Sequence, residues 1–166
     1  VRVLEASEKM ENLIHDADWK EGLAEWTVTQ DQEQVIAQIV PEFVDPFPAL
    51  PLNNLRVEGI RNFNFSISQK VWAAYPGIYC LSVEFLGTDT TNVDIRLFVQ
   101  SVRERRETVI HPVEHKWQIY KIESIRCREE YVTVGITIQA PPVYGIMRNF
   151  RLVKIGNMEE ERKENL

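Results

Sequence analysis

Three carboxylates stand close together near the start of the chain, in residues 12–26, which read NLIHDADWKEGLAEW. Asp16, Asp18 and Glu21 carry oxygen atoms of the kind that calcium ions prefer in proteins. Their spacing is not that of an EF-hand loop, because there is no Asp-x-Asp-x-Asp-Gly run and no glutamate at the twelfth position. These acids alone therefore do not predict a metal site.

The same stretch does not read as a helix. Its apolar residues do not form one stripe at helical spacing, and Gly22 interrupts them. We expect a strand, a turn and a second strand instead. Leu13 and Trp19 would enter the core, the two aspartates would belong to the turn, and Trp26 would begin the second strand.

The rest of the sequence contains no pattern typical of a catalytic centre. His111 and His115 lie four residues apart, but Pro112 between them argues against a helix that presents both to a metal ion. There is no GxSxG, no phosphate-binding loop, no GxGxxG, and no cysteine at a recognisable spacing from a histidine. This absence weighs against an enzyme.

Length and composition are those of one soluble globular domain. The chain has 166 residues, of which 44% are hydrophobic and 27% charged. A net charge of −6 and a pI of about 5.2 do not favour nucleic-acid binding, which normally needs a basic face. The apolar runs are too short to span a bilayer. Cys80 and Cys127 are either a disulfide pair or two buried free thiols.

From residue 62 onward, apolar and polar residues alternate with the period of a β-strand. The clearest runs are 62–68, 78–87, 93–99, 117–125, 131–138 and 147–155. Turn residues such as Pro76-Gly77 separate them. The only helix-like candidates are 31–38 and the charged tail, which has no apolar stripe. This pattern predicts an all-β fold, an antiparallel two-sheet β-sandwich.

Residues 41–54 interrupt this rhythm with four prolines. Proline cannot donate a ladder hydrogen bond and favours extended backbone, so we expect a long, stiff loop that carries Phe43 and Phe47. Long ordered loops on rigid sandwiches often carry binding. The alternative is that the two phenylalanines pack against the core.

Aromatic residues are the remaining source of chemistry. A sugar site needs a flat aromatic ring for the apolar face of a pyranose and planar polar groups for its hydroxyls. Tyr79 and Trp117 fall within strand patterns and are expected in the core. Trp72, Tyr75 and Tyr144 lie near turns and are candidates for exposure, with a core position as the alternative for each.

Several local patterns, taken in order, resemble the jelly-roll carbohydrate-binding modules. They are NLI (12–14), EWTV (25–28), FNFSISQKV (63–71), GIYCLS (77–82), WQIY (117–120) and VTVGITIQAPPVYGIMRNFRLV (132–153). GIYCLS is similar to the Gly-x-Tyr-x-Leu-Ser strand of these modules, and WQIY to their Trp-x-x-Tyr strand. The resemblance covers residues 12–155. It points to the galactan-binding modules of family 61, which are appended to bacterial family 53 endo-β-1,4-galactanases.

The sequence departs from this family at three places. Lys20 stands where the relatives keep an acid, and Arg148 and the residue after it stand where they keep two aspartates. In related modules an acid from each place helps to hold a structural calcium ion. A lysine and an arginine repel a cation, so we expect no cofactor and a calcium site lost at Lys20 and Arg148. The family's sugar-stacking tryptophan falls near Val57 or Glu58, and only Tyr144 stands where a second family aromatic would be.

The resemblance implies a non-catalytic carbohydrate-binding module that targets an appended glycoside hydrolase to a plant polysaccharide such as β-1,4-galactan. The ligand-binding residues would be Tyr144, Trp72 and Tyr75 for stacking, and Asn54, Arg56 and Arg148 for hydrogen bonds. The alternative is a structural or interaction domain of a multidomain secreted hydrolase that has lost sugar binding.

The same reading gives expectations for domains, partners and location. Residues 1–11, which begin VRVLEA, would be a linker or the end of a preceding domain, 12–155 the module, and 156–166 a charged tail. The partners would be a polysaccharide and neighbouring domains of the same chain, with no nucleic acid and no membrane. The protein would act outside the cell or on its surface.

Overall fold

The computed structural model describes residues 11–31, 35–42, 52–59, 62–87, 93–113, 116–140 and 144–158. These residues form ten strands and no helix. The strands are β1 (Thr27–Gln30), β2 (Ile36–Glu42), β3 (Leu52–Glu58), β4 (Phe63–Ala73), β5 (Gly77–Gly87), β6 (Asp94–Gln100), β7 (Arg105–Ile110), β8 (Gln118–Cys127), β9 (Glu130–Ala140) and β10 (Tyr144–Gly156). No helix long and apolar enough to cross a membrane occurs in these ranges.

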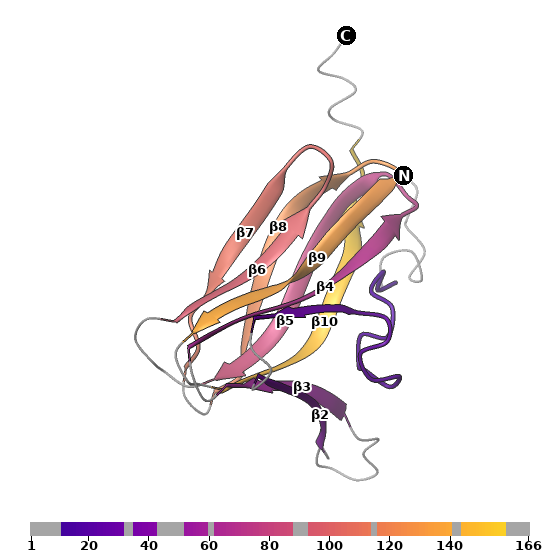
Figure 1. The fold of residues 1–166 in the computed structure, drawn as a ribbon. Helices are drawn as coiled ribbons and strands as arrows, with labels where there is room; N and C mark the ends of the chain where they lie inside the picture. The colour runs from indigo at the N-terminus through magenta and orange to yellow at the C-terminus, as the bar shows by residue number, and fades with distance from the viewer. Residues whose placement is uncertain are drawn as a thin grey trace.

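Two five-stranded antiparallel sheets pack face to face (Figure 1). Sheet A has the order β1-β4-β9-β6-β7, and sheet B has the order β2-β3-β10-β5-β8. The chain crosses repeatedly from one sheet to the other, as where β4 of sheet A is followed by β5 of sheet B. This is a jelly-roll sandwich, so the predicted all-β fold is confirmed.

The core lies between the two sheets and follows the alternation seen in the sequence. In β5 every second residue is buried, including Tyr79, Leu81, Val83 and Phe85, each at most 1% exposed. Gly145 of β10 faces the same space, and a Cβ atom there would lie 2.5 Å from Phe85 Cζ. The glycine therefore leaves room for the phenylalanine ring between the sheets.

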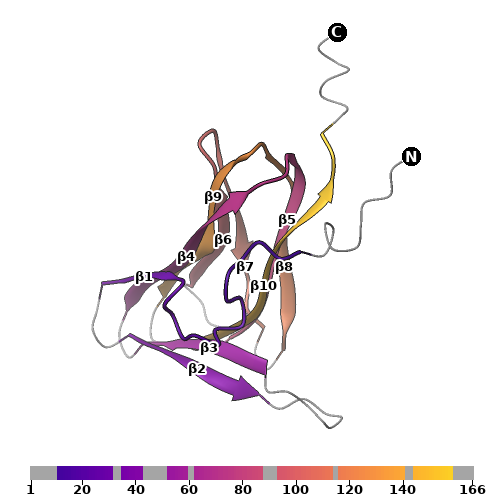
Figure 2. The same cartoon turned by 90° about the vertical axis from the view of Figure 1, so that its right-hand side faces the viewer.

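The N-terminal segment, residues 11–26, joins the two sheets along one side of the sandwich (Figure 2). Asn12 Nδ2 donates to Phe150 O at 2.9 Å, and Asn12 Oδ1 accepts from Leu152 N at 3.0 Å, both in sheet B. Gln69 of β4 in sheet A accepts from His15 N at 2.7 Å and donates to His15 O at 2.8 Å. Two side-chain amides thus fix the segment to both sheets.

The predicted turn within this segment is confirmed. Asp16 accepts hydrogen bonds from Lys20 N at 2.8 Å and Glu21 N at 2.9 Å, so its carboxylate serves the turn. Trp19 is 1% exposed, as expected, and Trp26 directly precedes β1. The residues before the turn form no regular strand, because only one backbone bond, from Leu13 N to Leu152 O at 3.0 Å, links them to β10 in the described structure.

Two predictions for residues 31–54 are wrong where the structure describes them. The helix-like stretch 31–38 contains the start of β2, whose partner is β3. The proline-rich stretch is not all loop, because β2 continues through Pro41 and β3 begins at Leu52. An edge strand tolerates proline, since one row of its backbone groups has no partner strand. Phe43 and Phe47 lie outside the described residues.

The two cysteines are free thiols. Cys127 pairs in register with Gly77 and points into the core, where it is 0% exposed. Cys80 lies three positions after Gly77, so alternation turns its side chain toward the outer face of sheet B, where it is half-buried. Opposite faces of one sheet prevent a disulfide, which settles the alternative that the sequence left open.

Candidate functional site

The sequence-predicted ligand residues do not gather in one place. They divide between β3 and β10 of sheet B (Asn54, Arg56, Arg148 and the backbone of Tyr144), β4 of sheet A (Trp72) and the turn before β5 (Tyr75). The Tyr144 side chain lies outside the described part of the chain. The two sheets therefore offer two separate outer faces for binding.

An exposed aromatic pair occupies one end of the outer face of sheet A. Trp72 of β4 and Tyr131 of β9 stand directly opposite each other, with ring centroids 4.7 Å apart and an interplanar angle of 60°. Their exposed fractions are 42% and 55%. Lys70 Nζ lies 4.9 Å from the centre of the Tyr131 ring. The predicted exposure of Trp72 is confirmed, as is that of Tyr75 in the adjoining turn.

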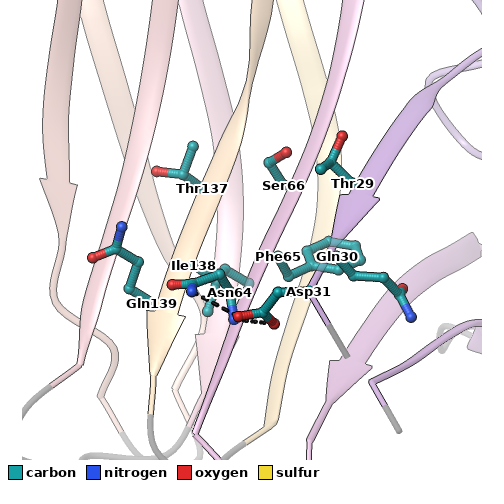
Figure 3. A pocket seen from close by; sticks show the side chains of 9 residues that line it. All are labelled: Thr29, Gln30, Asp31, Asn64, Phe65, Ser66, Thr137, Ile138 and Gln139. Carbon is teal, nitrogen blue, oxygen red and sulfur yellow. Dashed lines mark hydrogen bonds between the residues drawn. The ribbon is translucent and has the colours of Figure 1, made fainter. Parts of the chain in front are cut away.

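A hollow of about 250 Å³ lies at the other end of the same face (Figure 3). Figure 3 shows three hydroxyl side chains, Thr29, Ser66 and Thr137, side by side on β1, β4 and β9. The amides of Asn64 and Gln139 lie below them, at one further cross-strand position. Hydroxyls and planar amides are the groups that bind the hydroxyls of a sugar.

Asp31 completes this hollow. Its two carboxylate oxygens accept hydrogen bonds from Asn64 N at 2.9 Å and Asn64 Nδ2 at 2.7 Å. The backbone N–H of Asn64 is the main reason that the pKa of Asp31 lies below its ordinary value. The carboxylate is thus held ionised, with a fixed orientation, at the rim of the hollow.

Small side chains fill the middle of the face between these two ends. Ser68 of β4, Gly135 of β9 and Phe98 of β6 stand in one cross-strand row. Phe98 belongs to the outer face but is only 5% exposed, because Arg105 lies 4.2 Å above its ring. Ser68 and Gly135 are therefore the small residues in the middle of the face, and Phe98 and Arg105 lie beside them on β6 and β7.

Arg148 belongs to a different cluster, on the outer face of sheet B. Its guanidinium lies 3.9 Å from the centre of the Trp117 ring and 3.4 Å from a carboxylate oxygen of Glu84. Asn149 donates to the other oxygen of Glu84. Trp117 is half-buried at this outer face, so its expected place in the core is wrong. The alternation of its strand starts one residue later, at Gln118.

Asn54 and Arg56, on β3 of sheet B, differ in their access to solvent. Asn54 is 5% exposed. Arg56 Nη2 lies 3.1 Å from Glu58 Oε2, and both side chains are about two-fifths exposed. Val57, one of the two residues aligned with the family's stacking tryptophan, is 1% exposed. The position that the sequence resemblance assigns to the family's stacking tryptophan therefore holds a buried valine and a glutamate that is paired with Arg56.

The residues expected to replace the calcium ligands have other contacts. Lys20 Nζ lies 3.6 Å from Asp18 Oδ2, and Arg148 is held by Glu84 and Trp117. Within the described ranges, no group of three or more His, Cys, Asp or Glu side chains is arranged to hold a metal ion. The loss of the calcium site remains a prediction.

Sequence reasoning did not select several residues of the outer face of sheet A. Tyr131, Asn64, Ser66 and Thr137 were not among the predicted ligand residues. Their signal was present, because the polar residues of 62–68 alternate with core residues, and Tyr131 stands in phase with Thr133 and Thr137. The alternation predicts one outer face, but which strands meet on that face depends on the sheet order.

The fold is that of the jelly-roll carbohydrate-binding modules, so the resemblance seen in the sequence is confirmed at the level of the fold. No protein-family model and no curated protein sequence matches the chain. Among solved structures, it is similar to the family 61 module TmCBM61 in complex with β-1,4-galactotriose, with a TM-score of 0.72 and 18% identity. That alignment covers 87% of this chain and 99% of the module.

Two further structures show the breadth of this fold. A family 16 carbohydrate-binding module gives a TM-score of 0.60 at 15% identity, over 86% of this chain and 100% of that chain. The enzymatically active domain of tailspike protein 4 from bacteriophage CBA120 gives 0.63 at 12% identity, but only 21% of its length is covered. The two carbohydrate-binding modules are aligned over 99% and 100% of their own lengths.

Proposed function

We propose that this chain is a non-catalytic carbohydrate-binding module and that the outer face of sheet A binds a polysaccharide. The observation that carries the proposal is that an exposed aromatic pair and a hydroxyl-lined hollow share this face. Trp72 and Tyr131 offer ring faces to the apolar side of a pyranose. Thr29, Ser66 and Asn64 offer donors and acceptors to sugar hydroxyls.

The distance between the aromatic pair and the hollow determines how long a ligand must be to contact both. Trp72 and Asn64 are eight residues apart on β4, and a strand rises about 3.3 Å per residue, so they lie about 26 Å apart. One sugar ring cannot contact both ends. A glycan chain lying along β4 and β9 would contact the aromatic pair, the small residues in the middle and the hollow in turn.

The finer proposal is that the ligand is a plant polysaccharide, with β-1,4-galactan as the first candidate. It is supported by the fold likeness to a module solved with β-1,4-galactotriose. In this proposal the module is part of a glycoside hydrolase outside the cell or on its surface, and binding keeps the enzyme at its polysaccharide. Neighbouring domains of the same chain would be its other partners.

Affinity electrophoresis tests this proposal. The purified chain is run through native gels that contain β-1,4-galactan, arabinan, xylan or mixed-linkage glucan. We expect galactan to slow its migration relative to an unrelated protein of similar size. If no polysaccharide slows the chain, the proposed function is wrong.

One observation favours a second candidate, a structural domain that has lost sugar binding. At the family's usual stacking position, Val57 is buried and Glu58 is paired with Arg56. If migration is unaffected by every polysaccharide, and the chain instead binds tightly to a neighbouring domain of its own protein, this second candidate replaces the first.

A further inference from the structure

A second hollow lies on the outer face of sheet B, away from the face of sheet A discussed above. Its volume is about 390 Å³, and it lies over β5, β8 and β10. β5 is the middle strand of these three. The residues that line it include two cations, one acid, one hydroxyl, one amide and one exposed isoleucine.

The two cations stand in one cross-strand row. Ser82 of β5 pairs with Lys121 of β8 on one side and with Arg151 of β10 on the other. Neighbouring strands are about 4.8 Å apart, so the two cationic residues have Cα atoms about 10 Å apart, with the serine between them. The pKa of the adjacent Cys80 thiol is raised first by burial and next by the charge of Glu123, whereas the charges of Lys121 and Arg151 lower it, so these charged side chains lie near this part of β5.

Glu84 and Glu123 lie near these two cations, but neither acid forms an ion pair with them in the described part of the chain. Within the part of the chain that the structure describes, Lys121 and Arg151 have no ion pair or hydrogen-bonded partner for their side chains. The acid of the hollow, Glu84, is already bound by Arg148 and Asn149. The chain as a whole carries a net charge of −6. An anion between Lys121 and Arg151 would relieve the repulsion between these two cations.

A β-bulge supplies polar groups beside the cations. The register of β10 against β5 shifts between Arg148 and Arg151, and Asn149 within the bulge has a φ of 53°. Asn149 thus faces Glu84 on the outer surface. Ile119, 61% exposed, adds an apolar surface at the same hollow. Hydroxyl, amide, apolar and cationic groups are therefore within one cavity.

We propose that this hollow binds an acidic sugar residue, whose carboxylate or sulfate group lies between Lys121 and Arg151. The guanidinium of Arg151 matches the geometry of a two-oxygen anion, and Lys121 adds a second charge. Ser82 would bond a ring hydroxyl, and Ile119 would contact the apolar side of the ring. That the anion belongs to a saccharide rests on the proposed function, whereas the site itself does not involve sheet A.

Calorimetric titration at low salt tests this site. The probes are an oligogalacturonate, a sulfated galactan oligosaccharide, a neutral β-1,4-galactan oligosaccharide and sodium sulfate. We expect at least one acidic oligosaccharide to bind, and Lys121→Gln and Arg151→Gln each to weaken that binding by about tenfold or more. Arg128→Gln removes one exposed charge outside the hollow and should leave affinity within about twofold. Circular dichroism checks that each variant is folded.

The other possible results either identify which acidic group binds or rule out the site. Stronger binding of the carboxylated or of the sulfated probe identifies the anion. The proposal would be overturned if Lys121→Gln and Arg151→Gln both bind the acidic oligosaccharide as tightly as the native chain does. It would also be overturned if neither acidic probe binds. If inorganic sulfate binds as tightly as the oligosaccharides, the hollow is a general anion site and the proposal that it binds a sugar is wrong. Neutral galactan binding that survives Lys121→Gln and Arg151→Gln tests the sheet A face separately.

Discussion

The side-chain amide of Gln69 forms hydrogen bonds with both backbone groups of His15, 54 positions earlier in the chain. The same amide also donates to Glu25 O at 3.1 Å. Gln69 is 5% exposed, so water cannot readily replace these bonds. One buried side chain thus holds both ends of the N-terminal turn against β4.

Gln69→Ala should lower the free energy of unfolding by roughly 3 kcal/mol, because it leaves one backbone donor and two acceptors without their partner and opens a cavity. Gln69→Glu should not preserve stability at neutral pH, because a buried carboxylate loses both donor bonds and faces the carbonyl oxygens of His15 and Glu25. Urea denaturation measures both. Gln139→Ala, an exposed glutamine on the same sheet, is the control and should change stability little. Equal losses for the alanine variants would contradict the role of Gln69.

Gly145→Ala should destabilise the chain by roughly 1–3 kcal/mol, because the added Cβ would lie 2.5 Å from Phe85 Cζ. Gly156→Ala, on the same strand, meets its nearest atom at 3.9 Å and should be tolerated. Combining Gly145→Ala with Phe85→Leu should cost less than the sum of the two single changes, since the smaller side chain frees the space. Strict additivity in thermal unfolding would show that the two residues do not compete.

Thiol labelling should distinguish the two cysteines. In the native chain, a thiol reagent should modify Cys80 slowly and Cys127 not at all, because burial raises the pKa of both thiols and Cys127 is 0% exposed. Denaturation should make both react. Cys80→Ser should remove the native reaction. Labelling that needs prior reduction would instead indicate a disulfide and contradict this arrangement.

Stability should fall as the pH rises from about 9 to about 12. Burial raises the pKa of Cys127 to about 12 and that of Tyr79 to about 12, so the folded chain keeps protons that the unfolded chain loses. Stability from a raised pKa is complete below the unfolded value and is lost as the pH rises toward the folded value. Cys127→Ala should therefore give a shallower decline in urea midpoints over this range. An unchanged slope would show that this thiol does not titrate with unfolding.

From residue 62 onward, β4, β5, β6, β8, β9 and β10 could be predicted because each has one buried face, whereas β7 was not predicted. β4, β5 and β9 alternate in the sequence as they do in the structure. β2 and β3 could not be predicted. β2 is an edge strand and β3 is its neighbour, and their proline and polar residues interrupt the alternation of apolar and polar residues. Phe98 shows the same limit: alternation places it on the outer face, but only the pairing of β6 with β7 brings Arg105 over its ring.

The sequence predicted which kinds of residues form the candidate site, but not where on the fold they lie. Exposed Trp72 was found from its position near a turn, whereas its partner Tyr131 depends on the register of β4 against β9. Arg148 was selected from a resemblance to family motifs, but the β10 bulge and the contact with Trp117 decide its surroundings. Contacts between residues far apart in the chain are set by sheet order and register, which the sequence pattern alone does not contain.

The central claim is that polysaccharide binds to the outer face of sheet A. Calorimetric titration of β-1,4-galactan into the native chain, Trp72→Ala and Tyr75→Ala tests it most directly. Both variants remove an exposed aromatic, but Tyr75 lies in the turn beside Lys154, at the end of sheet B. We predict that Trp72→Ala weakens binding by about tenfold or more and that Tyr75→Ala changes it by less than about twofold. Native affinity for Trp72→Ala would contradict the account.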